Sequence, residues 1–207
     1  MRLLMIPLLF LPLCASAQGE WERPDVATRE EAKTELSHEN GKYLEGAVSE
    51  VDGQVQWTLN LDVPDKNAQE IYDTMLAFLV RLTKEENQLD NSSVSLVNKK
   101  EHVIVASMRE WLVFKKNVLS VDRTKFNYTL VAACSDNHLK VDMIRLSYKY
   151  EEERVKGGYY YKAEEWINDK NALNKKKTKL LGSCAKFRCK TIDRKDEIFA
   201  RVTGLFK

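Results

Sequence analysis

Apolar and polar residues alternate strictly between Gln54 and Val63. The apolar members, which would share one face of an extended segment, are Val55, Trp57, Leu59, Leu61 and Val63. A period of two residues predicts a strand with one buried face and one solvated face. Pro64 and Asp65 then end the strand, because both residue types favour turns.

A helix is predicted directly after this strand. Asn67 is followed three residues later by Glu70, which is the spacing of a capping box. Apolar residues then recur at helical spacing, namely Ala68, Ile71, Tyr72, Met75, Leu76 and Leu79. We expect this helix to continue to about Glu85 and to pack its apolar stripe on a sheet.

Four further strands follow the helix. The ranges that favour strands are Val94–Asn98, Val103–Lys115, Thr124–Ser135 and Leu139–Tyr150. In the last of them the apolar phase shifts between Met143 and Ile144, and a β-bulge would explain that shift. The order of strand, helix and four strands indicates an α+β domain with an antiparallel sheet over residues 43–150.

A C-terminal extension, residues 151–207, begins at Glu151–Glu153 and Gly157–Gly158. It contains a short helical patch around Trp166 and a final helix that Asp193 could cap. The apolar stripe of that helix comprises Ile198, Phe199, Val202, Leu205 and Phe206. We expect this helical extension to pack on the sheet.

The second of the four strands is apolar on both faces. One face carries Val103, Val105, Trp111 and Val113, and the other carries Ile104, Ala106, Met108, Leu112 and Phe114. An antiparallel sheet covered by one helix should leave its other face polar. Either the C-terminal extension covers this second face, or a partner protein or an apolar ligand does.

Arg109 and Glu110 interrupt each face of that strand once. A charged side chain within a buried face requires a partner. Arg109 and Glu110, together with the neighbouring Trp111, are therefore the candidate binding residues.

The N-terminal residues have the pattern of a secretory signal peptide. Arg2 is followed by an apolar run from Leu3 to Leu13 and by the small-residue site at Ala15–Ala17. We expect cleavage between Ala17 and Gln18, with residues 18–42 forming a charged, mobile arm. The run is too short for a membrane span, and no later run is longer, so no transmembrane segment is expected in the mature chain.

This signal predicts export to the periplasm or the cell surface. Lipid anchoring at Cys14 is the less favoured alternative, because Leu13 fits poorly before an acylated cysteine. Export permits disulfide bonds, and Cys184 and Cys189 are close enough in sequence to pair. Cys134 lies on the apolar side of its strand, where a buried thiol is expected.

Charge and motifs exclude several classes of function. The net charge of +2 gives no electrostatic footprint for nucleic acid. The three histidines (His38, His102 and His138) have no cysteine or carboxylate neighbours at metal-ligand spacing. We therefore expect no metal, no cofactor and no catalytic residues, since the usual catalytic motifs are also missing.

Several segments resemble one known family. They are Tyr43–Val48, Val51–Val55, Val63–Lys66, Ile71–Asp73, Tyr161–Ile167, Ala172–Asn174, Lys186–Arg188 and Ile192–Asp193. As a set they are similar to an exported domain-of-unknown-function family of Bacteroidetes with a TATA-binding-protein-like (TBP-like) fold. The resemblance covers about residues 43–206. It implies a β-α-β4 antiparallel sheet with one long helix and a C-terminal helical extension, but no activity.

The leading hypothesis is a non-enzymatic binding or protein-interaction module. One alternative is a carrier of a lipid or other small apolar ligand, which would need a closed pocket between the long helix and the sheet or tail. The other is an enzyme with an unfamiliar site. A fold by itself does not choose among these, because function resides in sites.

Overall fold

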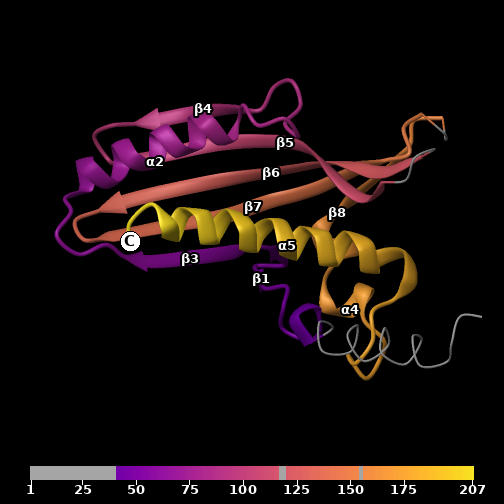
Figure 1. Cartoon of the computed structure of the whole chain (residues 1–207). Helices are drawn as coiled ribbons and strands as arrows, with labels where there is room; N and C mark the ends of the chain where they lie inside the picture. The colour runs from indigo at the N-terminus through magenta and orange to yellow at the C-terminus, as the bar shows by residue number, and fades with distance from the viewer. Residues whose placement is uncertain (1–40, 117–119, 154–155) are drawn as a thin grey trace, which may run out of the picture. The chain divides into compact units, whose positions relative to one another are not determined.

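A long antiparallel sheet forms the centre of the fold (Figure 1). The computed structural model describes residues 41–116, 120–153 and 156–207. The strands are β3 (Trp57–Asp62), β4 (Ser93–Asn98), β5 (Val103–Lys116), β6 (Val121–Ser135), β7 (His138–Tyr150) and β8 (Tyr159–Lys162). The order is β3-β7-β6-β5-β4, and β8 pairs with β7 beyond the end of β3. The predicted α+β class and the β-α-β4 order are confirmed.

The segment before β3 is more structured than expected. Gly41 and Lys42, placed in the mobile arm by the sequence analysis, belong to the short 3-10 helix η1 (Gly41–Tyr43). The expected strand from Gln54 is interrupted, because β2 (Gln54–Val55) pairs with β1 (Glu50–Val51) rather than with the main sheet. The predicted signal peptide, its cleavage site at Ala17 and Gln18, and Cys14 lie outside the described residues.

Helix α2 (Ala68–Leu82) begins at the predicted capping box. The side chain of Asn67 accepts from the Glu70 amide at 3.0 Å, and the Glu70 carboxylate accepts from the Asn67 amide at 2.9 Å. The helix ends at Leu82 rather than Glu85, with Thr83 as its C-cap.

The predicted bulge in β7 is present, two residues beyond the expected position. Asn127 pairs with Ser147 and Thr129 pairs with Ile144, so that Arg145 and Leu146 together oppose one residue of β6. Arg145 has a φ of +58°, a left-handed conformation that is uncommon for residues other than glycine. The bulge returns the following apolar residues of β7 to the buried face.

The C-terminal extension differs from its prediction in two ways. Tyr159–Lys162 forms β8 before the short helices α3 (Ala163–Trp166) and α4 (Asp169–Ala172). The final helix, α5 (Gly182–Gly204), starts eleven residues before the predicted cap at Asp193. The early half was missed because its buried stripe includes Arg188 and Thr191, which interrupt the apolar pattern.

Helices α2 and α5 cover the same face of the sheet (Figure 1). Alternate residues of β5, from Ile104 to Leu112, are buried, as are those of β6 from Thr124 to Cys134. The residues between them are exposed or half-buried throughout. The expectation that the C-terminal extension covers the second face is therefore wrong, since it extends the layer begun by α2.

Aromatic packing fixes α5 on the sheet. The Phe187 ring lies 4.6 Å from Phe114 and 5.2 Å from Tyr148, measured between ring centroids. Next to it, the fully buried Arg188 donates to the carbonyls of Tyr43 and Ile167 and forms an ion pair with Asp169 at 2.7 Å. These contacts tie α5 to η1 and α4.

No helix of the described segments combines the length and apolarity that crossing a membrane requires.

Candidate binding face

The side of the sheet that α2 and α5 leave uncovered is the candidate site, and we call it the open face. Its residues on β5, β6 and β7 are Val103, Val105, Ser107, Arg109, Trp111, Val113, Arg123, Lys125, Asn127, Thr129, Val131, Ala133, Lys140, Asp142, Ile144, Ser147 and Lys149. None of these side chains is buried within the described structure. An exposed sheet face that combines apolar and polar side chains in this way is a candidate interaction site.

One end of the open face is apolar. Val105 pairs with Leu96 on one side and with Val131 on the other, so these side chains form a row across three strands. Val103 and Ala133 form the next pair along the same strands. Leu96 is 51% exposed, although leucine is usually buried. This end therefore offers a surface that would gain free energy from contact with a partner.

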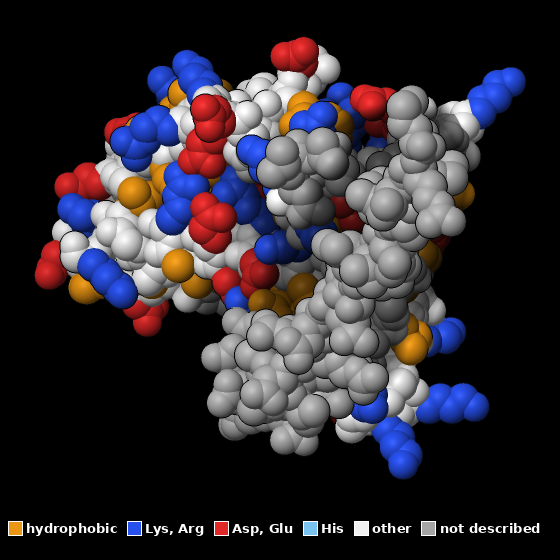
Figure 2. Space-filling model, turned by 45° about the vertical axis from the view of Figure 1, so that its right-hand side comes forward, with side chains coloured by type: hydrophobic (Ala, Val, Ile, Leu, Met, Phe, Trp, Pro, Cys, Tyr) orange, Lys and Arg blue, Asp and Glu red, His pale blue; other side chains and the backbone are white. Residues whose placement is uncertain are grey.

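The other end of the open face carries basic side chains beside acidic ones. The Arg123 guanidinium lies 3.7 Å from the ring centroid of Trp111, and Lys125 pairs with Glu152 at 2.7 Å. A cavity of about 310 Å³ at this end is lined by Trp111, by the basic residues Arg123, Lys125 and Lys149, and by the acidic residues Asp122, Glu151, Glu152 and Glu153. In Figure 2, basic and acidic side chains are likewise interspersed over the surface in view.

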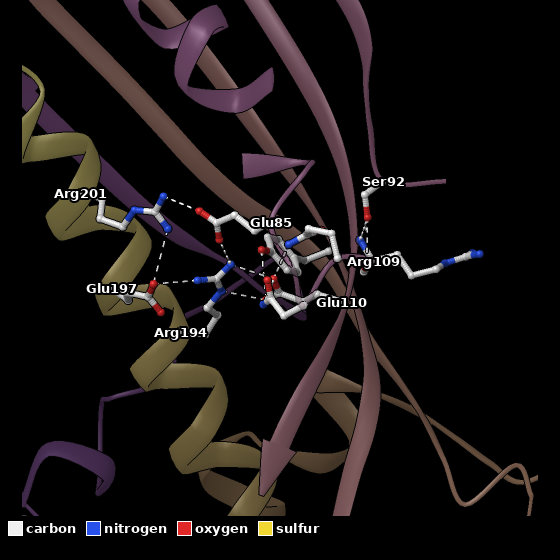
Figure 3. A network of polar contacts seen from close by, with 10 residues as sticks. Glu85, Ser92, Arg109, Glu110, Arg194, Glu197 and Arg201 are labelled. Atoms are coloured by element: carbon white, nitrogen blue, oxygen red, sulfur yellow. Dashed lines mark hydrogen bonds and ion pairs between the residues drawn. The ribbon is translucent and has the colours of Figure 1, made fainter. Parts of the chain in front are cut away.

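Arg109 lies in the middle of the open face. Its Nε donates to Asn127 Oδ1 at 3.0 Å, across the pair that joins β5 to β6. Its backbone is fixed by Ser92, whose hydroxyl accepts from the Arg109 amide at 2.9 Å. Figure 3 shows the guanidinium pointing away from Glu110, on the other side of β5. Among the described residues, Arg109 forms no ion pair with a carboxylate.

Glu110 belongs to the buried face and is fully buried (Figure 3). Its carboxylate accepts from Arg194 Nε at 2.9 Å and from Arg194 Nη2 at 2.8 Å, a bidentate pair that joins β5 to α5. Asn87, Gln88 and Tyr128 also donate to this carboxylate. The donors satisfy a charge that burial would otherwise make very unfavourable.

The charges of this network support one another. Burial by itself would lower the pKa of Arg194, but the hydrogen bonds and charge of Glu110 outweigh it and hold the pKa above its ordinary value. Burial and the Glu110 charge both raise the pKa of Tyr128, so the phenol stays protonated as a donor. Arg194 also pairs with Glu197 at 2.8 Å and with Glu85 at 3.3 Å.

The structure thus separates the three candidate binding residues. Arg109 and Trp111 lie on the open face, whereas Glu110 lies under α5. Grouping all three in one site was wrong, because consecutive residues of a strand point to opposite faces. The prediction that a buried charge here has a partner is confirmed for Glu110. No sequence pattern indicated that Arg194 is that partner, since strand and helix are distant along the chain.

All three cysteines of the described chain are free thiols. Cys184 and Cys189 lie five positions apart on α5, which places them about 140° apart around the helix axis, so they do not form the disulfide considered above. Cys134 is buried as predicted, and burial raises the pKa of its thiol to about 11. Burial and the charge of Asp193 raise the pKa of Cys189 to about 11 as well.

Within the described residues, no group of three or more histidine, cysteine or carboxylate side chains could hold a metal ion. Tyr72 and His102 make an edge-on ring contact at 5.8 Å, and the Tyr72 hydroxyl has no hydrogen-bond partner there. The His102 Nε2 lies 3.3 Å from Gln69 Oε1. This arrangement offers no nucleophile beside a base.

Comparison with known proteins identifies a family that the chain matches. The family described as a domain of unknown function (DUF4468) with a TBP-like fold matches residues 57–149. A crystal structure of a DUF4468 family protein from Bacteroides ovatus is 37% identical, with a TM-score of 0.74, over 81% of this chain and 94% of that chain. No curated protein matches.

A second solved structure supports the fold alone. It is a TBP-like protein from Parabacteroides distasonis, 20% identical, with a TM-score of 0.61, over 76% of this chain and 96% of that chain. Both neighbours have the sheet and helix arrangement described above, and neither description states a ligand or a reaction.

Proposed function

Because the chain belongs to the DUF4468 family, whose description assigns no function, we propose a function from its own surface: it is a non-enzymatic binding module. The open face receives a protein partner whose contacting surface is acidic and partly apolar. The single observation that carries this proposal is the open face itself, where β5 is apolar on the side that no described helix covers.

The charge of the open face supports an acidic partner. Arg109, Arg123 and Lys149 are exposed on three neighbouring strands. The one acidic residue in the set that defines the face, Asp142, is already paired with Lys140 at 2.9 Å. Complementary charge raises the rate of encounter, while apolar contact supplies most of the affinity.

The buried face gives less support to a carrier of apolar ligands. The helix residues that point to the sheet, including Met75 and Leu79, are fully buried, as is Leu130 beneath them. A carrier would need a cavity between these layers. The cavity at Arg109 lies on the open face instead, and the cavity at Trp111 lies where the ends of β5, β6 and β7 meet.

Export is part of the proposal. The N-terminal pattern from Arg2 to Ala17 supports a periplasmic or cell-surface location, where the partner would also reside. Intact-mass measurement of the protein from its host tests this directly. A chain beginning at Gln18 is expected, and a chain that retains Met1 to Ala17 would contradict export through this signal.

Site-specific photocrosslinking tests the binding face. A photoreactive amino acid replaces Val131 on the open face in the full chain, expressed in its host. The matched control carries the same amino acid at Val80, which is 37% exposed on α2. We expect a discrete crosslinked protein from position 131 only.

A charge-reversal variant at Arg109 tests whether the partner's surface is acidic. Arg109→Glu should reduce the crosslinking yield at position 131 severalfold, because it would repel an acidic partner. Equal yields at positions 131 and 80, or no adduct at position 131, would overturn the proposal.

A further inference from the structure

A small cavity lies on the open face beside Arg109. Its volume is about 160 Å³, and its walls include Ser107, Asn127, Thr129 and the guanidinium-bearing residues Arg109 and Arg145. Since one water occupies about 30 Å³ of liquid, a group of four or five heavy atoms fits this space. The walls offer hydroxyl, amide and guanidinium donors.

Arg109 is held in place for binding. Asn127 occupies its Nε, so that the two Nη groups carry the remaining N–H donors. Asn127 is itself oriented by Ser147, since its Nδ2 lies 3.5 Å from the Ser147 hydroxyl. A guanidinium whose position is already fixed loses less entropy on binding an anion.

Arg145 reaches the same cavity because of the bulge in β7. Its φ of +58° is a conformation that a glycine would adopt more readily, yet the chain has an exposed arginine at this position. Uncommon backbone conformations of this kind are concentrated at functional sites. Within the described chain, Arg145 forms no ion pair with a carboxylate.

The nearest acidic side chain on β7 is already occupied. Asp142 accepts from Lys140 Nζ at 2.9 Å and from Thr58 Oγ1 at 2.6 Å. Among the described residues that line it, the cavity therefore has two cationic side chains and no acidic one. Two guanidiniums with neutral donors between them match a tetrahedral anion of charge −2 better than a single carboxylate.

We infer that this cavity binds a tetrahedral oxyanion, as the phosphate or sulfate group of a ligand. The inference deepens the proposed function and rests on it, because the anion is then one chemical group by which the open face selects its partner. Arg109 and Arg145 supply the charge, and Asn127 positions Arg109.

Titration of the full chain with inorganic phosphate, sulfate or acetate tests the site at constant, low ionic strength. NMR chemical shifts of Arg109, Asn127, Thr129 and Arg145 report binding at the cavity. We expect saturable shifts with phosphate or sulfate, and the stronger of the two identifies the group that the ligand carries. Acetate should bind at least tenfold more weakly, because it offers one charge and two acceptors.

Three variants distinguish binding of the anion at this cavity from general attraction of the anion to positive charge on the protein. Arg145→Gln and Arg109→Gln should each weaken phosphate or sulfate binding by about tenfold, because each removes charge-assisted hydrogen bonds. The matched control is Arg81→Gln, which removes an exposed arginine from α2 and should leave the affinity unchanged. Thermal unfolding confirms that the variants fold, since all three side chains are exposed.

Two results would overturn the inference. One is that sodium chloride at equal ionic strength reproduces the shifts, and the other is that Arg145→Gln binds as the unchanged protein does. The crosslinking experiment distinguishes failure of the anion site from failure of the proposed protein-binding function. An adduct at Val131 without phosphate or sulfate binding removes only the anion site, whereas anion binding without an adduct removes the protein partner.

Discussion

The two faces of the central sheet differ in what their charges do. Glu110 lies on the buried face, where Arg194 and three neutral donors satisfy its carboxylate. Arg109, the preceding residue, lies on the open face, where only Asn127 contacts its guanidinium among the described side chains. One charge therefore stabilises the fold, while its neighbour along the strand is exposed and forms no ion pair with a described carboxylate.

The same contrast recurs on the other two strands. Leu130 is fully buried and Val131 is half-buried, while Leu146 is buried and Arg145 is exposed. Each pair consists of neighbours along a strand of which one is buried and the other is not. Paired substitutions therefore measure how strongly the two faces differ.

The largest effect is expected at Glu110. Glu110→Ala should lower the free energy of unfolding by about 3–5 kcal/mol, because it leaves Arg194 buried without its partner. Arg109→Ala should change it by less than about 0.5 kcal/mol. Urea denaturation measures both variants.

A double substitution serves as the control for this pair. Glu110→Leu combined with Arg194→Leu should be less destabilised than Glu110→Ala, because no unpaired charge remains. Equal destabilisation by Glu110→Ala and Arg109→Ala would contradict the contrast between the faces.

The next effect compares apolar neighbours. Leu130→Ala should destabilise the protein by about 3 kcal/mol, since it opens a cavity between the sheet and α2. Val131→Ala removes a half-buried side chain and should cost less than about 1 kcal/mol. Thermal or urea unfolding of the two variants checks this difference. Similar losses for both would mean that another part of the chain covers the open face.

A smaller effect is expected at the bulge. Arg145→Gly should be about 1 kcal/mol more stable than Arg145→Ala, because only glycine adopts a positive φ without a steric penalty. Both variants should lose the proposed anion affinity equally. If alanine and glycine gave the same stability, the left-handed conformation of Arg145 would be in doubt.

The smallest effect is a pH dependence at the edge of the buried network. Burial alone would raise the pKa of Glu85, but Arg201 and Arg194 outweigh it and hold the pKa below its ordinary value. A lowered carboxyl pKa contributes stability above the ordinary value of 4.5, and this contribution is lost as pH falls through the folded-state value.

Arg201→Gln should therefore reduce stability by about 0.5 kcal/mol at pH 7, with the difference disappearing well below pH 4.5. Urea denaturation between pH 7 and pH 3 measures the difference. Arg81→Gln on α2 is the control, and its free energy of unfolding should depend on pH in the same way as that of the unchanged protein. A pH-independent difference for Arg201→Gln would show that its effect does not come from Glu85.

Local patterns were sufficient for the elements that alternate strictly or are capped by adjacent residues. The capping box of α2 and the phase shift in β7 could both be predicted, because each depends on residues within a few positions. The early half of α5 could not, since Arg188 and Thr191 occupy its buried stripe and form hydrogen bonds with distant segments. Tyr159–Lys162 was missed as a strand because it pairs only with the end of β7.

The candidate site, too, could be predicted only in part from the sequence. The sequence alone showed that β5 is apolar on two faces and that Glu110 would need a partner if buried. Only the tertiary structure decided that α2 and α5 cover the same face, because the choice of face depends on the path of the chain after β7. Arg109 and Arg145 line one cavity for the same reason. The register between strands brings residues that are distant in sequence together, whereas local periodicity predicts only which face of a strand a side chain occupies.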